Sequence, residues 1–136
     1  MKAAVRSLVV VMASLLVACH GSGNGEPTSF AHRTKLPSCG IFTLTNPTLS
    51  AAQKAMIDCI VEAARTGTPK ELDYSRPGTD CCHRRTVIRV LGVQSVEEYT
   101  SSDGADWRRA TCRSVGTTGE PFGYVQAVSC DPPEPV

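Results

Sequence analysis

The positions of the cysteines constrain the fold of this chain more than any other feature of its sequence. The chain has 136 residues and seven cysteines, six of which follow residue 38. Those six are Cys39, Cys59, Cys81, Cys82, Cys112 and Cys130. In a small exported chain, an even number of cysteines is typical of a disulfide framework. Aromatic residues make up only 5% of the sequence, so we expect a thin core in which each disulfide contributes about 2–4 kcal/mol of stability.

The N-terminal residues follow the order of an export signal. Lys2 and Arg6 provide positive charge, an apolar run extends from Leu8 to Val17, and a small residue follows. The apolar run is too short to span a bilayer as a helix of the mature protein. We therefore expect residues 1–18 to be a signal peptide that is removed.

The end of this run, Leu16-Val17-Ala18-Cys19, resembles the lipobox of bacterial lipoproteins. In that family the cysteine thiol is acylated and the cysteine becomes the first residue of the mature chain. The resemblance implies that Cys19 is a lipid attachment site, with membrane lipid as a partner. Acyl chains add roughly 0.8 kcal/mol of membrane affinity per buried CH₂ group, and two chains anchor a protein stably. The alternative is an ordinary secreted protein in which Cys19 occurs by chance.

Composition divides the mature chain into a tether, a domain and a tail. Residues 19–37 are rich in Gly, Ser, Asn, Pro and Thr without apolar periodicity, which predicts a flexible tether. Residues 38–131 suit a single domain, and residues 132–136 are expected to be a loose tail. Loss of Lys2 and Arg6 leaves a net charge near zero, without the basic footprint of a nucleic-acid binder. We expect a monomer with no nucleic-acid partner.

One amphipathic helix is predicted over about residues 49–66. Ser50 and Gln53 have the spacing of a capping box, and Gly67 is placed to end the helix. Apolar residues recur at steps of three and four, which predicts one buried face. That face comprises Ala52, Met56, Cys59, Ile60 and Ala63.

The segments after Gly67 are predicted to be strands. They are residues 70–74, 85–93, 96–100, 107–115 and 122–130, separated by turn-forming residues at hairpin spacing. Residues 39–44 are a further short strand or an extended strap. One helix followed by four or five short strands favours an α+β fold, with the N-terminal helix packed on an antiparallel sheet and stapled by disulfides.

The region from Cys59 to Val115 resembles a group of uncharacterised small lipoproteins and secreted domains of bacteria. The shared features are the helix running into Gly67-Thr68-Pro69, Leu72, the run 86–92, Glu98-Tyr99-Thr100, Asp103, Asp106 and Ala110-Thr111-Cys112. This resemblance implies a small exported domain and carries over no catalytic residues. The chain departs from the group at Cys81-Cys82-His83, where such proteins tend to have a Gly-Asp-Pro-like turn.

The disulfide pairing stays open at the level of sequence, because six cysteines allow 15 pairings. Strand geometry favours Cys112–Cys130 as a bridge between facing strands. A rival is Cys59–Cys112 across the helix–sheet interface. A further option is Cys39–Cys59, with Cys81 and Cys82 left over.

Cys81-Cys82-His83 is the sharpest local motif. Two thiolates and an imidazole suit Cu(I) or Zn²⁺, and a vicinal disulfide would be easily reduced. Adjacent side chains rarely reach one tetrahedral centre, however, so structural bridging is the favoured interpretation and we expect neither a metal nor a cofactor. The chain also lacks a Gly-x-Ser-x-Gly motif, and Glu97 and Glu98 point to opposite faces of a strand, so no catalytic residues are expected.

Arginines suggest a binding surface. Arg84, Arg85 and Arg89 lie on one predicted strand, and Arg108, Arg109 and Arg113 on another. Arg109 and Arg113 share a strand face, and together with Arg89 and the nearby Trp107 they could form a ligand face for phosphates or carboxylates. The alternative, which we favour, is that acidic residues on neighbouring strands pair with these arginines.

These observations predict a non-enzymatic lipoprotein, anchored in a bacterial cell membrane or outer membrane and facing the extracytoplasmic side. Its expected role is that of a binding or interaction module for an envelope protein, a peptide or a polyanionic polymer. One alternative is an inhibitor of exported peptidases or other hydrolases, which would act through its hairpin loops. A second is a thiol-redox or metal-binding protein acting through Cys81-Cys82-His83.

Overall fold

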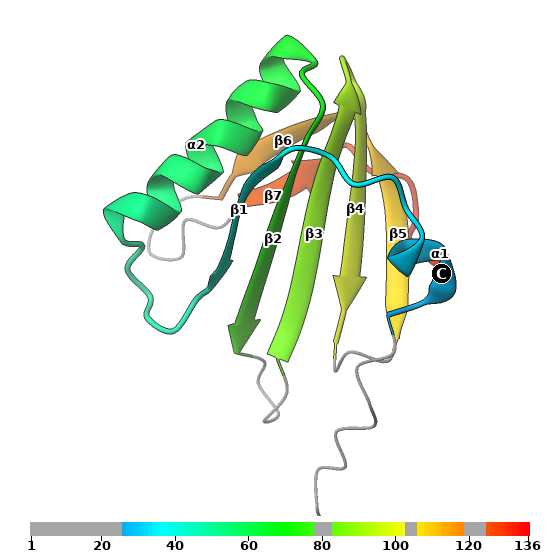
Figure 1. Ribbon diagram of the computed structural model, residues 1–136, viewed down its shortest axis with the longest axis horizontal. Coiled ribbons are helices and arrows are strands. Elements are labelled where there is room, and N and C mark those ends of the chain that lie inside the picture. The colour runs from blue at the N-terminus through cyan, green and yellow to red at the C-terminus, as the bar shows by residue number, and fades with distance from the viewer. Residues whose placement is uncertain (1–25, 78–82, 103–105, 119–124) are drawn as a thin grey trace, which may run out of the picture.

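A computed structural model describes residues 26–77, 83–102, 106–118 and 125–136 (Figure 1). This part of the chain is mostly β-sheet with two helices. The helices are α1 (Thr28–Ala31) and α2 (Ala51–Thr66). The strands are β1 (Ser38–Thr43), β2 (Lys70–Pro77), β3 (His83–Gly92), β4 (Ser95–Ser101), β5 (Trp107–Cys112), β6 (Ser114–Thr117), β7 (Val125–Val128) and β8 (Glu134–Pro135).

The main sheet of the described residues has six strands in the order β1-β2-β3-β4-β5-β8. β1 and β2 are parallel, since α2 carries the chain back across the sheet between them, and the other neighbours are antiparallel. β6 and β7 form a separate two-stranded hairpin. The sheet is therefore larger than the four or five strands that the sequence predicts, because β1 and β8 extend its two edges.

Helix α2 corresponds to the helix predicted over residues 49–66, although the short α1 precedes it. The Ser50 side chain accepts a hydrogen bond from the Gln53 backbone N–H, and the Gln53 side chain accepts one from the Ser50 N–H. Gly67 ends the helix with a left-handed φ of 71°. A Cβ there would lie 2.5 Å from the Val93 side chain, so both conformation and space require glycine.

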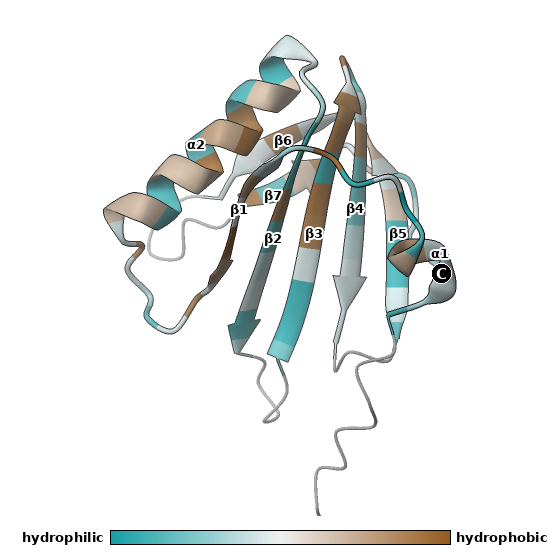
Figure 2. Ribbon diagram, viewed as in Figure 1, coloured by the Kyte–Doolittle hydropathy of each residue, from teal (hydrophilic) through white to brown (hydrophobic). Residues whose placement is uncertain are grey.

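The main core lies between the sheet and a layer formed by α2 and the β6–β7 hairpin. Figure 2 shows apolar positions on α2, β1 and β3, the elements that enclose this core. β3 is buried from Thr86 to Val90 because both faces of the sheet are covered there. The buried apolar residues that the sheet and hairpin contribute to this core are Phe42, Leu72, Tyr74, Ile88, Val90, Val96, Cys112, Val115, Val125 and Ala127.

Residues 26–37, which we call the N-terminal strap, cover the opposite face of the sheet (Figure 1). Phe30 is fully buried against Val87, Tyr99 and Trp107, with its ring centroid 4.6 Å from that of Trp107. The guanidinium of Arg33 lies 3.6 Å from the Phe30 ring centroid. The sequence predicts a flexible tether over residues 19–37, whereas in the structure residues 26–37 pack onto the sheet, because Phe30 fits an aromatic site there.

The C-terminal residues also differ from the loose tail predicted over 132–136. β8 pairs with β5 through Arg108 and Arg109, and the Val136 N–H donates a hydrogen bond of 3.1 Å to the Trp107 carbonyl. Backbone hydrogen bonding therefore places this tail at the edge of the main sheet.

Two disulfides join described residues. Cys39–Cys59 links β1 to α2. Cys112–Cys130 links the last residue of β5 to Cys130, which lies two residues after the end of β7. The favoured Cys112–Cys130 pairing is confirmed, and the rival Cys59–Cys112 is wrong because Cys59 lies against β1. Cys81 and Cys82 are outside the described residues. None of the described helices is both long and apolar enough to cross a membrane.

Candidate functional site

The four residues predicted as a ligand face are not gathered on one open surface. Arg89 and Trp107 are buried beneath the N-terminal strap. Arg109 is exposed and lies 3.9 Å from a Glu134 carboxylate oxygen, and Arg113 is exposed beyond the end of β5. The strap was not expected on this face, and it covers the part of the sheet that would have been available to a ligand.

Arg89 instead forms a buried ionic network. Its Nη1 lies 2.5 Å from Glu97 Oε2, its Nη2 donates to the Thr34 carbonyl at 2.7 Å, and its Nε lies 3.5 Å from Glu71 Oε2. Glu71 is also 3.3 Å from Arg33 of the strap. The alternative interpretation, in which acidic neighbours pair with the strand arginines, therefore holds for Arg89.

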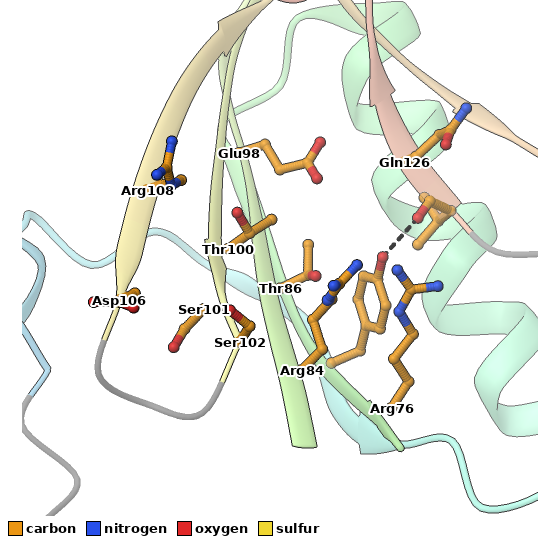
Figure 3. A pocket seen from close by; sticks show the side chains of 12 residues that line it. Arg76, Arg84, Thr86, Glu98, Thr100, Ser101, Ser102, Asp106, Arg108 and Gln126 are labelled. Atoms are coloured by element: carbon orange, nitrogen blue, oxygen red, sulfur yellow. Dashed lines mark hydrogen bonds between the residues drawn. The ribbon is translucent and has the colours of Figure 1, made fainter. Parts of the chain in front are cut away.

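A pocket of about 450 Å³ opens on the other face of the sheet (Figure 3). α2 covers only part of this face, and the pocket lies where β2, β3, β4 and β5 continue past the helix. Val125 and Gln126 of β7 form its far wall. The polar and charged side chains that matter most here are Arg76, Arg84, Thr86, Glu98, Thr100 and Arg108. We call this site the arginine pocket.

Strand alternation and register bring these residues together. Side chains two positions apart on a strand share a face, so Arg84 and Thr86 point to the pocket while Arg85 points to the strap. Arg76 pairs directly with Arg84, and Thr100 pairs with both Thr86 and Arg108. Figure 3 shows Arg76 and Arg84 side by side at one side of the pocket, Arg108 on β5 at the other side, and Glu98, Thr100 and Thr86 between them.

In the part of the chain that the structure describes, the arginines that line the arginine pocket outnumber the carboxylates. Arg76 and Arg84 are directly opposite each other in the register, an arrangement that destabilises an antiparallel pair. Among the described residues, no carboxylate lies within 4.0 Å of the Arg84 or Arg108 guanidinium, although Asp106 also lines the pocket. Guanidinium groups without a neighbouring carboxylate can bind a phosphate or carboxylate.

Glu98 is the half-buried carboxylate of the pocket. Its Oε2 accepts a hydrogen bond of 3.1 Å from the Ala127 N–H of the hairpin. Burial raises the pKa of Glu98 above its usual range, while the Ala127 hydrogen bond and the charge of Arg76 lower this pKa in part. Deprotonated Glu98 therefore costs folding energy and weakens the positive potential of the pocket.

Glu98→Gln is expected to stabilise the protein at neutral pH. An acid whose pKa is raised by folding binds more protons in the folded state, so wild-type stability falls as pH rises through the raised pKa. The variant lacks this loss but keeps an oxygen to accept from Ala127. Urea denaturation at several pH values should show a gain that is present at pH 7 and vanishes below the ordinary pKa of glutamate. A variant less stable than wild type at pH 7 would contradict this account.

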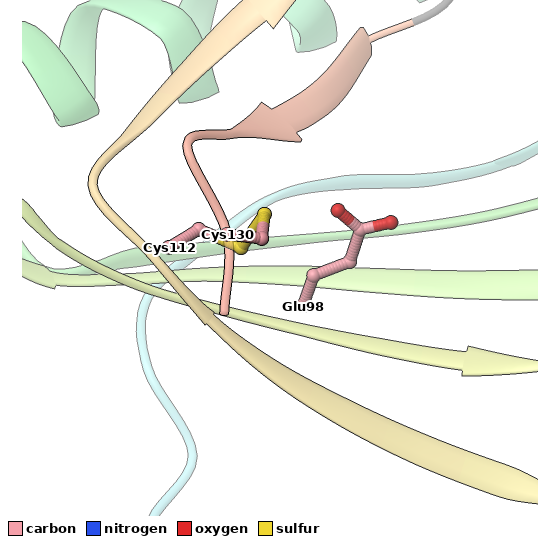
Figure 4. Close-up of side chains that lie close together, drawn as sticks. All are labelled: Glu98, Cys112 and Cys130. Carbon is pink, nitrogen blue, oxygen red and sulfur yellow. A yellow bond between two sulfur atoms is a disulfide. The ribbon is translucent and has the colours of Figure 1, made fainter. Parts of the chain in front are cut away.

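Glu98 also lies beside the Cys112–Cys130 disulfide (Figure 4). One carboxylate oxygen and the two sulfurs lie within 4.8 Å of one another. Disulfide sulfurs carry no thiolate charge, and metal binding by cysteine requires the thiolate. This cluster therefore offers a cation a single carboxylate, and its donor chemistry does not suit a metal centre.

The remaining predicted sites fall mostly outside the described residues. Cys19, Cys81 and Cys82 are among these, and so are residues 103–105 and 119–124 of the loops that an inhibitor would use. His83 begins β3, where it is exposed and pairs with Pro77.

The sequence contained a signal for the arginine pocket. Because side chains alternate between the two faces of a strand, Arg84 points to the opposite face from Arg85 and Arg89. On the other strand, Arg108 points to the opposite face from Arg109. Which of the two faces stays open depends on where α2, the hairpin and the strap pack, and alternation alone does not reveal that.

Comparisons with protein-family models, with curated proteins and with solved structures found no match to the chain. Its function is therefore inferred from the side chains of the pocket.

Proposed function

We propose that the protein is a non-catalytic, lipid-anchored binding module of the bacterial cell envelope, and that the arginine pocket binds an anionic group. One observation carries the proposal: Arg84 and Arg108 enter one pocket from β3 and β5, and no carboxylate of the described residues lies within 4.0 Å of either guanidinium. Arg76 adds a third positive charge.

The chemistry of the pocket supports binding rather than catalysis. Guanidinium groups stay protonated at physiological pH, so they can hold a phosphate or carboxylate but cannot transfer protons. Thr86 and Thr100 offer hydroxyl groups that can donate further hydrogen bonds to the same anion. The N-terminal export pattern and the lipobox-like Leu16-Val17-Ala18-Cys19 support the envelope location.

Calorimetric titration of the purified protein with inorganic phosphate tests this function. We expect saturable binding that weakens with added salt, as screening reduces the attraction of exposed charges. Arg84→Gln and Arg108→Gln should each reduce the affinity by about tenfold, which corresponds to roughly 1.5 kcal/mol for a charge-assisted hydrogen bond.

Arg109→Gln and Arg113→Gln serve as matched controls. They remove the same charge from exposed positions outside the pocket and should leave the affinity nearly unchanged. An equal loss in all four variants, or no saturable binding by the wild-type protein, would refute an anion site in the pocket.

A further inference from the structure

The N-terminal strap begins at the same end of the sheet as the arginine pocket. Glu26 is the first described residue, and its Oε1 lies 2.6 Å from Arg85 Nη1. Arg85 is adjacent to Arg84 on β3, and the two side chains leave the sheet on opposite faces. The chain therefore enters the domain at the same end of the sheet as the pocket, on the opposite face (Figure 1).

The chain between the predicted anchor and the strap is short. Residues 20–25 separate Cys19 from Glu26. At up to ~3.6 Å per residue, an extended chain of this length spans at most about 25 Å. If Cys19 is acylated, Glu26 stays within that distance of the lipid headgroups, and Glu26 lies at the pocket end of the sheet. A flexible tether that extended to residue 37 would allow the domain to lie much farther from the membrane and to rotate freely relative to it.

The lining of the pocket suits one kind of headgroup. Arginines bind phosphate through several directed hydrogen bonds, and the hydroxyls of Thr86, Thr100 and Ser102 can pair with those of a polyol. Among the described residues that line the pocket, Arg76, Arg84 and Arg108 outnumber the acids Glu98 and Asp106 by one formal charge. The pocket thus has the charge to match a monoanion that combines a phosphate with hydroxyl groups.

We propose that the arginine pocket binds the glycerol phosphate headgroup of an anionic phospholipid in the membrane that anchors the protein. This inference rests on the proposed function and on acylation of Cys19. Because tethering raises the effective concentration of the headgroup to the millimolar range, a weak site is sufficient. Binding would hold the domain with the pocket end of its sheet against the membrane, while the far end of the sheet projects outward.

Energy transfer from Trp107 to a headgroup-labelled lipid tests the proposal. Trp107 is the only tryptophan of the sequence and begins β5 at the pocket end of the sheet. The full-length lipoprotein, purified from membranes with its acyl chains, is reconstituted into phosphatidylcholine vesicles with or without phosphatidylglycerol. Each vesicle carries a trace of dansyl-labelled lipid. We expect higher transfer in the phosphatidylglycerol vesicles, and this excess should disappear in an Arg84→Gln/Arg108→Gln variant.

Control experiments distinguish failure of headgroup binding from failure of the anion site itself. An Arg109→Gln/Arg113→Gln variant has the same net charge and should keep the excess transfer; if it loses the excess too, general surface attraction explains the result and the proposal is overturned. Equal transfer on both vesicle types overturns the proposal as well. If free glycerol phosphate still binds the pocket in calorimetry in that case, the proposed function survives. Failure of phosphate and glycerol phosphate to bind at all would remove both.

Discussion

Phe30→Ala is expected to lower the free energy of unfolding by about 3–5 kcal/mol, the usual cost of truncating a buried phenylalanine. Such a loss is a large fraction of the stability of a small domain. Phe30 is fully buried, and its ring packs on both Tyr99 and Trp107 at centroid distances of 4.9 and 4.6 Å. The effect would be unusual for a residue in a segment whose composition resembles a flexible linker.

Urea denaturation followed by circular dichroism measures this loss. Ser29→Ala is the matched control, since Ser29 is the exposed neighbour of Phe30 in α1 and its truncation should change stability by less than about 0.5 kcal/mol. The emission of Trp107 should also shift to longer wavelength in Phe30→Ala, because removal of the ring admits water. Equal stability of the two variants, without a spectral shift, would mean that the strap does not stabilise the sheet.

Arg89→Met is expected to destabilise the protein by about 3–5 kcal/mol, because it leaves partly buried carboxylates without their cation. The Arg89 side chain is only 7% exposed, and those of Glu71 and Glu97 are 14% and 19% exposed. Glu71 keeps Arg33 as a partner, so the main loss concerns Glu97. The hydrogen bond to the Thr34 carbonyl is lost as well, which should loosen the end of the strap.

A double-mutant cycle separates the ion pair from packing. The Arg89→Met/Glu97→Met variant removes both charges and should recover most of the stability lost in Arg89→Met alone. Chemical denaturation of the four proteins in the cycle gives the coupling energy. If the double variant is destabilised by the sum of the two single losses, Glu97 and Arg89 are not coupled, and their ion pair does not stabilise the fold.

Local sequence signals predicted helix α2 and one disulfide correctly. The helix has its cap, its apolar spacing and its terminating glycine within one continuous segment, so tertiary contacts are not needed to recognise it. Cys112 and Cys130 lie on the two strands of a predicted hairpin, and hairpin geometry brings residues on facing strands together. Both features depend on residues that are close together in the sequence, so they can be predicted without knowledge of the tertiary structure.

The N-terminal strap could not be recognised in the same way. Its residues are mostly polar, and a single phenylalanine gives no periodicity from which to predict a packed segment. The site that receives Phe30 is formed by β3, β4 and β5, which lie more than fifty residues further along the chain. The binding site for Phe30 exists only once β3, β4 and β5 have come together in the sheet, so the sequence of the strap alone does not predict it.

The packing of α2, the β6–β7 hairpin and the strap on the sheet also determines which arginines form the candidate site. Arg109 and Arg113 share a face of the predicted strand, and the sequence groups them with Arg89 and Trp107 as a candidate ligand face, while favouring their pairing with acidic neighbours. α2 and the hairpin leave the opposite face open at one end, and that end carries Arg84 and Arg108. Strand alternation separates Arg84 from Arg85 and Arg108 from Arg109, while the choice between the two faces requires the positions of the covering layers.

The most direct test of the anion site is a site-resolved titration. Proton–nitrogen NMR resolves the Nε–Hε group of each arginine, and phosphate is added to the isotope-labelled protein while these signals are followed. We predict saturable shifts for Arg84 and Arg108, with one common dissociation constant, and little change for Arg109 and Arg113. Small linear shifts spread over all arginines, or saturation only at Arg109 and Arg113, would contradict the assignment of the pocket as the anion-binding site.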